Sequence, residues 1–117
     1  MSLTTAGRKL GVPTGHRFGM LRNLATDLIR YEAIRTTTPK AREACKFAEH
    51  LISIAKRGDL IARRRVERDI KDPLVIKKLF GPLKTRYQTR AGGFTRIFSI
   101  GNRAGDNSPM SLVKLIP

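Results

Sequence analysis

The chain has 117 residues and a mass of 13.1 kDa, and its 24 Lys+Arg against nine Asp+Glu leave a formal net charge of +15. A chain of this length supports one domain with a modest core, and no apolar run approaches the roughly 18 to 20 residues that span a bilayer. The single cysteine excludes an internal disulfide framework, and no apolar block follows the first ten residues. We therefore expect a reducing compartment and no secretory leader.

The excess of positive charge is the unusual property of this sequence. The pI is near 11.3, and every quarter of the chain carries more basic than acidic side chains. Such self-repulsion predicts a polyanionic partner. Arginine outnumbers lysine, which favours bidentate contact with phosphate, and the absence of tryptophan argues against a membrane-surface helix. The predicted partner is nucleic acid, with no membrane.

The first elements are an arm, a helix and a strand. Residues 1–15 are rich in Gly, Thr and Ser without hydrophobic periodicity, so we expect an extended basic arm that phosphate orders. A floppy terminus without a role is the alternative. Apolar residues at helical spacing predict a helix from Thr14 to about Tyr31, and the β-rich segment 33–37 predicts a strand.

The next two helices have clear boundary signals. Thr38 and Pro39 predict an N-cap followed by proline in the first turn, and an alanine-rich apolar face then continues for about five turns. Gly58 should end this helix, with basic residues in its last turn. Asp59 is predicted to cap a third, arginine-rich helix with Val66 facing inward.

The last part of the chain changes from helical to strand patterns. A short fourth helix is predicted from Asp72 onward with Asp72 as its cap, and the Gly81-Pro82 pair should break it. Segments 94–100 and 110–116 predict two strands, joined by a nine-residue loop, 101–109, that is long for a hairpin. The order helix, strand, helices, β-hairpin predicts an α+β fold, a two-layer α/β domain. We expect an arm over 1–15 and a single globular domain over 16–117.

Catalytic and metal-binding patterns are absent from the sequence. His16 and His50 are the only histidines, and Cys45 lies on the apolar face of a predicted helix. Cys45 and His50 are about 140° apart around that helix, so a small buried hydrophobe is the better interpretation of Cys45. No metal-ligand spacing or nucleotide-binding glycine motif occurs. We expect no enzyme, no cofactor and no metal; an RNA-processing enzyme, whose activity would be lost on changing His16 or His50, is a further alternative.

The aromatic residues do not indicate a standard single-strand reader. Phe94 and Phe98 are an even number of residues apart, so we expect them on one strand face, packed in the core rather than stacked on bases. What remains is phosphate binding by many arginines, which recognises the shape of a folded RNA.

A DNA-binding winged helix is the main rival prediction. In that case the arginine cluster at 63–68 is the recognition helix and the loop around Arg103 is the wing. Basic residues are not concentrated on these two elements, and the cluster lacks the Asn or Gln side chains that read bases. A solvated helix face explains the same arginine run equally well.

Several blocks of sequence, taken in order and with their spacing, resemble a known family. They are Gly7-Arg8-Lys9-Leu10, Gly15-His16-Arg17, Leu21-Arg22-Asn23-Leu24, the segment 34–43, the segment 51–60, Lys78-Leu79-Phe80, the segment 92–97 and Arg103-Ala104-Gly105-Asp106. Together they are similar to the L-seventeen family of bacterial large-subunit ribosomal proteins. The resemblance implies a structural, non-catalytic protein with an arm in RNA, whose partners are large-subunit rRNA and neighbouring large-subunit proteins. We expect no homo-oligomer, and a ribosome in the bacterial cytoplasm or, alternatively, in a mitochondrion or plastid.

The resemblance also implies individual rRNA contacts. These fall in the arm and the start of the first helix, at the strand-to-helix junction, and in the hairpin: Arg8, Lys9, His16, Arg17, Thr36, Thr37, Lys40, Arg42, Arg96 and Arg103. Further phosphate contacts are predicted at Arg22, Arg63, Arg64 and Arg90.

Overall fold

The computed structural model of the chain describes residues 14–117. The elements follow in the order α1 (Thr14–Tyr31), β1 (Ala33–Thr37), α2 (Thr38–Ala55), α3 (Leu60–Glu67), α4 (Pro73–Lys78), the π-helical segment η1 (Leu79–Leu83), α5 (Lys84–Tyr87), β2 (Thr95–Asn102) and β3 (Pro109–Leu115). The predicted arm over 1–15 lies outside the described residues except for its last two, which already belong to α1. The first helix and the first strand have the predicted bounds.

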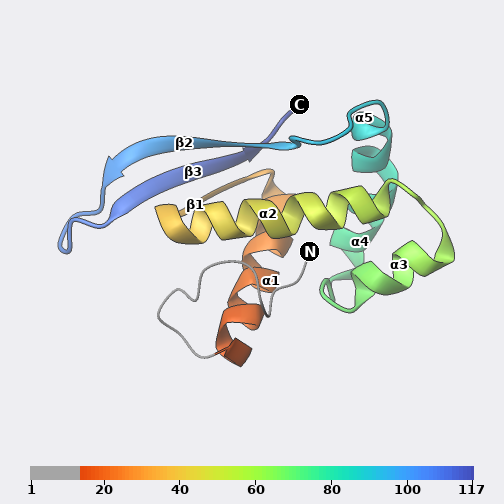
Figure 1. Cartoon of the computed structure of the whole chain (residues 1–117), viewed down its shortest axis with the longest axis horizontal. Helices are drawn as coiled ribbons and strands as arrows, with labels where there is room; N and C mark the ends of the chain where they lie inside the picture. The colour runs from red at the N-terminus through yellow and green to blue at the C-terminus, as the bar shows by residue number, and fades with distance from the viewer. Residues whose placement is uncertain (1–13) are drawn as a thin grey trace.

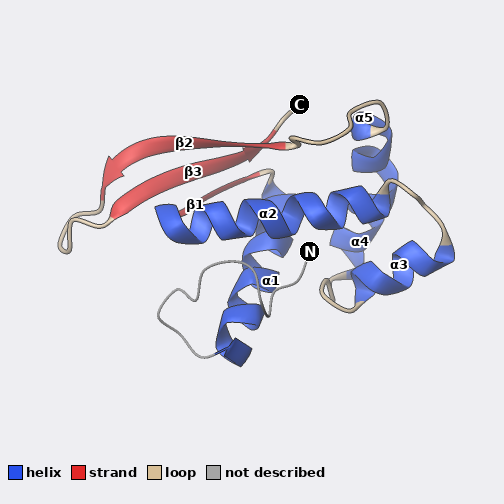
Figure 2. Cartoon of the chain, in the orientation of Figure 1, coloured by secondary structure: helices blue, strands red, loops and turns tan. Residues whose placement is uncertain are grey.

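The strands of this described region form one antiparallel sheet in the order β1-β3-β2, so β3 is central. The helices gather on one side of the sheet, and α2 runs alongside the strands (Figures 1 and 2). Alternate residues of β3 point toward this helical layer: Ser111, Val113 and Leu115 are buried, and Lys114 between the last two is exposed. The predicted α+β class with helices on one sheet face is confirmed.

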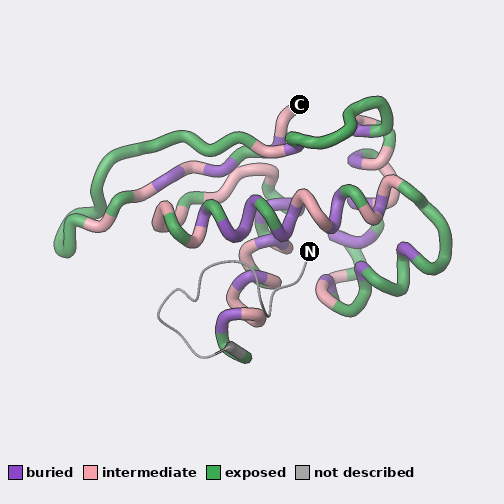
Figure 3. The backbone as a smooth tube through the Cα atoms, viewed as in Figure 1, coloured by how far each residue is buried: buried purple, intermediate pink, exposed green. Residues whose placement is uncertain are grey.

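The core is centred on α1 and α2 and extends to the sheet on one side and to α3, α4, η1 and α5 on the other. The predicted apolar stripe of α1 is buried at Leu21, Ala25, Leu28 and Ile29, each 2% exposed or less. The facing surface of α2 is rich in alanine, which lets the two helices approach closely, and buried positions recur along both (Figure 3). Cys45 is buried on this face, and burial raises the pKa of its thiol, as expected for a small hydrophobe.

Of the three predicted N-caps, two are confirmed and one is wrong. Asp59 accepts a hydrogen bond from the Ala62 backbone N–H (2.8 Å), and Asp72 accepts one from Leu74 (2.9 Å), so both caps are confirmed. The predicted cap at Thr38 is wrong, because α2 begins at Thr38 itself. Its hydroxyl shares a hydrogen bond with the Ser111 hydroxyl (2.8 Å) and thereby joins α2 to β3.

The predicted break at Gly81-Pro82 is also wrong. The chain stays helical there, as the π turn η1 that links α4 to α5. Leu79 and Leu83 are fully buried one turn apart, and burying a leucine side chain is worth about 1.5–3 kcal/mol. This burial offsets the backbone hydrogen bond that Pro82 cannot donate, and the wider π turn accommodates its ring.

The hairpin differs from the prediction in its boundaries. β2 continues to Asn102 and β3 starts at Pro109, so the connecting loop is 103–108 rather than 101–109. Phe94 precedes the strand and is fully buried, with its ring centroid 5.0 Å from that of Tyr87. Phe98 is 43% exposed, so the prediction that both rings share a core-facing strand side is wrong.

No helix in residues 14–117 combines the length and the apolar character that a membrane crossing requires.

Gly58 lies in the turn between α2 and α3, and its substitution tests how the chain is able to turn there. Its φ is +71°, a left-handed conformation that costs a residue with a side chain about 1–2 kcal/mol. We expect Gly58→Ala to lower the free energy of unfolding by about 1 kcal/mol, measured by urea denaturation. An added methyl group also meets the flexible end of Lys84, which can move away. Gly92→Ala is the control, since Gly92 has no positive φ and open space around it; equal destabilisation by both changes would contradict this account.

Candidate nucleic-acid interface

Most carboxylates of the described residues are engaged within the protein. Their ion pairs are Arg22–Asp69, Arg30–Asp72, Lys46–Glu43, Arg63–Glu67, Lys78–Glu32, Arg86–Glu32 and Arg103–Asp106. Asp59 caps a helix, and Glu49 accepts hydrogen bonds from the backbone N–H and the hydroxyl of Thr95. Few negative charges are left to balance the other cations.

Glu32 is the most connected of these carboxylates. It lies between α1 and β1 with a left-handed φ of 63°, and its oxygens are 2.5 Å from Arg86 Nη1 and 2.9 Å from Lys78 Nζ. The hydrogen bonds from Arg86 and then Lys78 lower the pKa of Glu32 to about 2. Its backbone carbonyl also accepts the N–H of Leu115 (2.9 Å). One residue therefore joins the end of α1 to α4, α5 and β3.

A larger set of lysines and arginines has no carboxylate partner among the described residues. These residues are Arg35, Lys40, Arg42, Lys56, Arg57, Arg64, Arg65, Arg68, Lys71, Lys77, Lys84, Arg90, Arg96 and Lys114. They come from helices and strands alike, so the unbalanced charge covers several faces. Three groups stand out, on α3, on the sheet and beside the first turns of α2.

The α3 group is formed by Arg64, Arg65 and Arg68, all exposed. Ala62 and Val66 occupy the buried side of the helix. Because an α-helix turns once every 3.6 residues, positions 64, 65 and 68 fall outside the side of the helix that carries Ala62 and Val66. The group is a surface suited to phosphate, since each guanidinium offers several N–H donors.

The sheet group is formed by Arg35, Arg96 and Lys114, one from each strand. Arg96 and Lys114 are directly paired across β2 and β3, and Arg35 lies on the same face, opposite Leu112. This face points away from the helical layer, and all three side chains are exposed. No Asp or Glu occurs in any of the described strands.

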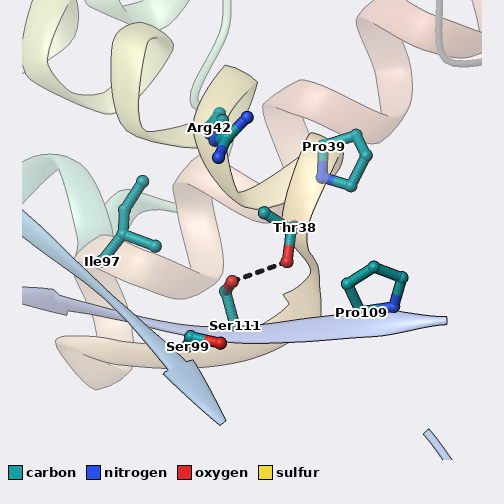
Figure 4. A pocket seen from close by; sticks show the side chains of 7 residues that line it. All are labelled: Thr38, Pro39, Arg42, Ile97, Ser99, Pro109 and Ser111. Carbon is teal, nitrogen blue, oxygen red and sulfur yellow. Dashed lines mark hydrogen bonds between the residues drawn. The ribbon is translucent and has the colours of Figure 1, made fainter. Parts of the chain in front are cut away.

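An open cleft of about 640 Å³ lies on the other face of the hairpin, next to the start of α2 (Figure 4). Its lining residues come from α2, β2 and β3: Thr38, Pro39, Arg42, Ile97, Ser99, Pro109 and Ser111. Ile97 is paired with the buried Val113 and faces the same side of the sheet, yet it stays 38% exposed because it borders this open cleft.

The chemistry of the cleft is cationic, hydroxylic and apolar, without a carboxylate. Arg42 supplies a full positive charge, while Thr38 and Ser111 hold each other by a hydrogen bond at its floor. Its volume falls within the roughly 300–1,000 Å³ of small-ligand pockets. These features suit a phosphate-bearing group with a partly apolar surface.

The four RNA contacts predicted at the junction of β1 and α2 lie on different faces of the protein. Thr36 is paired with Ser111 and shares the helix-facing side of the sheet, whereas Thr37 is paired with Met110 on the opposite side. Lys40 is half-buried on α2, and of the four junction residues only Arg42 lines the cleft. The structure therefore does not bring the four together.

The other predicted contacts lie in varied settings. Arg8 and Lys9 lie outside the described residues, His16 is exposed, and Arg17 is only 6% exposed, with its guanidinium 5.3 Å from the centre of the Phe18 ring. Arg22, Arg63 and Arg103 are held by Asp69, Glu67 and Asp106 in turn. Arg64, Arg90 and Arg96 are exposed without a carboxylate partner among residues 14–117.

Sequence reasoning missed the cleft-lining hydroxyls Ser99 and Ser111 and the sheet cations Arg35 and Lys114. Alternation along each strand was a usable signal, because Ile97 and Ser99 share a face, as do Val113 and Ser111. The pairing of β1 with β3, however, cannot be read from the local pattern.

The described residues contain no cluster of His, Cys, Asp and Glu that could hold a metal ion. Cys45 is buried and His50 half-buried on α2, and burial lowers the pKa of the imidazole. This arrangement offers no nucleophile paired with an accessible base.

The geometry does not fit the winged-helix alternative. Figure 1 places α3 and the tip of the β2–β3 hairpin at opposite ends of the long axis, which extends over 45 Å. A recognition helix and a wing must reach neighbouring grooves of one duplex. The arginine of the predicted wing, Arg103, is moreover held by Asp106.

Comparison with known proteins decides the family. The family described as Ribosomal protein L17 matches residues 20–116. The chain belongs to the ribosomal protein L17 family. A relative named large ribosomal subunit protein bL17, from Caldanaerobacter subterraneus subsp. tengcongensis, is 50% identical over 109 residues, which cover 93% of this chain and 97% of the relative.

Other members of the L17 family agree over most of the chain. The bL17 protein of Anaeromyxobacter sp. (strain Fw109-5) is 47% identical over 116 residues, which cover 99% of this chain and 69% of the relative. That of Syntrophobacter fumaroxidans is 49% identical over 111 residues, which cover 95% and 74%. The family expected from the ordered sequence blocks is confirmed.

The Glu32 network of this L17 family member predicts acid sensitivity. The folded-state pKa of Glu32, about 2, lies below the ordinary value of 4.5. The stabilisation that ionised Glu32 provides is therefore fully present at pH values above 4.5 and is lost as the pH falls toward 2. Glu32→Gln should lower the free energy of unfolding near neutral pH by about 1 kcal/mol, a modest amount because the ion pairs of Glu32 are partly exposed to solvent. The difference in stability between the variant and the wild type should vanish near pH 2.

Denaturation with urea at several pH values measures this effect. Asp27→Asn is the control, because Asp27 is exposed on α1 and forms no ion pair with a described residue. A Glu32→Gln profile parallel to that of the wild type at all pH values would refute the role of Glu32.

Proposed function

We propose that this protein is a structural constituent of the large ribosomal subunit that binds folded rRNA through distributed contacts between Arg or Lys and phosphate. The observation that supports this most is the separation of charges: most carboxylates serve the fold, and a larger set of cations has no carboxylate partner within residues 14–117. A polyanion with a folded shape supplies the missing charge on several faces at once.

The α3 group, the sheet group and the cleft beside Arg42 are the proposed contact surfaces. Predicted contacts at His16, Arg90 and Arg96 belong to the same proposal, as do Arg8 and Lys9 in the arm. The relatives are named as bacterial large-subunit proteins, so the proposed site is the bacterial-type ribosome, with one copy among other subunit proteins. No catalytic role is part of this proposal.

Salt dependence tests the proposal. If the protein neutralises about eight phosphates, the logarithm of its rRNA affinity should fall with the logarithm of salt concentration at a slope of about −6 to −7. Filter binding to large-subunit rRNA at increasing KCl concentrations measures the slope. Duplex DNA is the competitor that separates this proposal from the winged-helix alternative: rRNA should displace it easily. A slope near −1, or DNA displacing rRNA, would refute the proposal.

Neighbouring arginines on α3 provide a matched test of individual contacts. Arg64 has no carboxylate partner among the described residues, whereas Arg63 Nε lies 3.3 Å from Glu67. Arg64→Gln should weaken rRNA binding and make the salt slope shallower by about 0.7 to 0.9, because one phosphate contact is lost. The double change Arg63→Gln/Glu67→Gln removes a pair without altering net charge, so the slope should stay that of the wild type. The same slope for both variants would contradict the assignment.

A further inference from the structure

The sheet face that points away from the helices carries an apolar strip among its cations. Across the strands, Phe98 pairs with Leu112, and Leu112 pairs with Arg35; the adjacent row on the same face contains Arg96 and Lys114. Residues on this face alternate with the buried ones that contact the helical layer. β2 is exposed along nearly its whole length (Figure 3), and Phe98 retains 43% of its accessible surface.

Phe98 differs from the other aromatic residues of the described chain because its ring is exposed and has no aromatic or cationic neighbour. Phe18, Tyr31, Phe80, Phe94 and Tyr87 each have an Arg or Lys charge within 6 Å of the ring centre. Phe47 has no such partner but is buried in the core. Among residues 14–117, Phe98 alone combines an exposed ring with the absence of any ring or cation partner.

We propose that Phe98 is a stacking platform for an unpaired nucleobase of the bound RNA, with Arg35, Arg96 and Lys114 holding the flanking phosphates. This inference rests on the proposed function and deepens it, because it adds a contact that duplex RNA cannot make. Bases stack on aromatic rings whatever their sequence, since every base has a π face.

The dimensions of the sheet fit this assignment. Arg96 is two residues from Phe98 along β2, which is roughly 7 Å, and Lys114 is its diagonal neighbour on β3, at roughly 7–8 Å. Arg35 is two strands away, at roughly 10 Å. The three long basic side chains lie along β2 and toward β3 and β1, within reach of phosphates next to a base stacked on the ring.

The charge of this face favours RNA over a neighbouring protein as the occupant. The strands contribute three cations and no carboxylate, and the nearest described acidic side chain in the hairpin, Asp106, is held by Arg103. A protein partner of ordinary composition would face uncompensated positive charge here, whereas the phosphates beside an unpaired base supply the opposite charge.

Two RNA probes and two substitutions test the proposal. The probes are a fully paired RNA duplex and a hairpin with the same stem and a loop of unpaired purines, one of them 2-aminopurine. The wild-type chain should bind the hairpin about tenfold more tightly than the duplex and quench the 2-aminopurine fluorescence. Phe98→Leu should lose the tenfold preference and the quenching, while duplex affinity is retained. Phe98→Tyr, which keeps an aromatic ring, should behave like the wild type.

Thermal unfolding without RNA is measured for each variant, so that a loss of fold is not mistaken for a loss of stacking. Equal wild-type affinity for both probes, or an unchanged preference in Phe98→Leu, would overturn the stacking platform and leave the proposed function intact. If the wild type bound neither probe at low salt, the proposed function itself would fail, and the platform with it. A Phe98→Leu variant that binds both probes normally but is lost from reconstituted subunits would overturn the platform in favour of a protein neighbour.

Discussion

Electrostatic repulsion is the constraint on which this structure depends. The chain has a net charge of +15, yet it forms a core in which residues of the five helices, η1 and the sheet pack together. It does so in part because three of its nine acidic side chains act where elements meet: Glu32 joins four elements, Asp72 both caps α4 and pairs with Arg30, and Asp69 binds Arg22 on α1. With the carboxylates engaged in this way, the remaining cations stay at the surface, where a polyanion can balance them.

The β2–β3 hairpin extends beyond the helical layer, and this extension gives it two open faces (Figure 1). One face borders the cleft, where Arg42 and the paired hydroxyls of Thr38 and Ser111 meet. The other presents Phe98 between cations. The first suits a phosphate-bearing group and the second a flat, unpaired base, so a single hairpin offers complementary contacts to a folded RNA.

Local signals predicted much of the fold. The apolar stripe of α1, the bounds of β1 and the caps at Asp59 and Asp72 depend on neighbouring residues, so the sequence alone was sufficient for them. The prediction failed where a distant contact outweighed local preference. Thr38 bonds Ser111 instead of capping α2, and buried leucines hold the helix through Pro82.

The sequence by itself determined the charge, the α+β order of elements and, through its ordered blocks, the ribosomal protein L17 family. These depend on composition, periodicity and spacing, which are properties of the chain rather than of its folding. Only the tertiary structure decided which arginines are neutralised, because Arg22 and Asp69 are far apart in sequence and meet only when α1 packs beside the end of α3. It also decided that Phe98 is exposed while Phe94 is buried, since pairing of β2 with β3 and the reach of the helical layer set the environment of each ring.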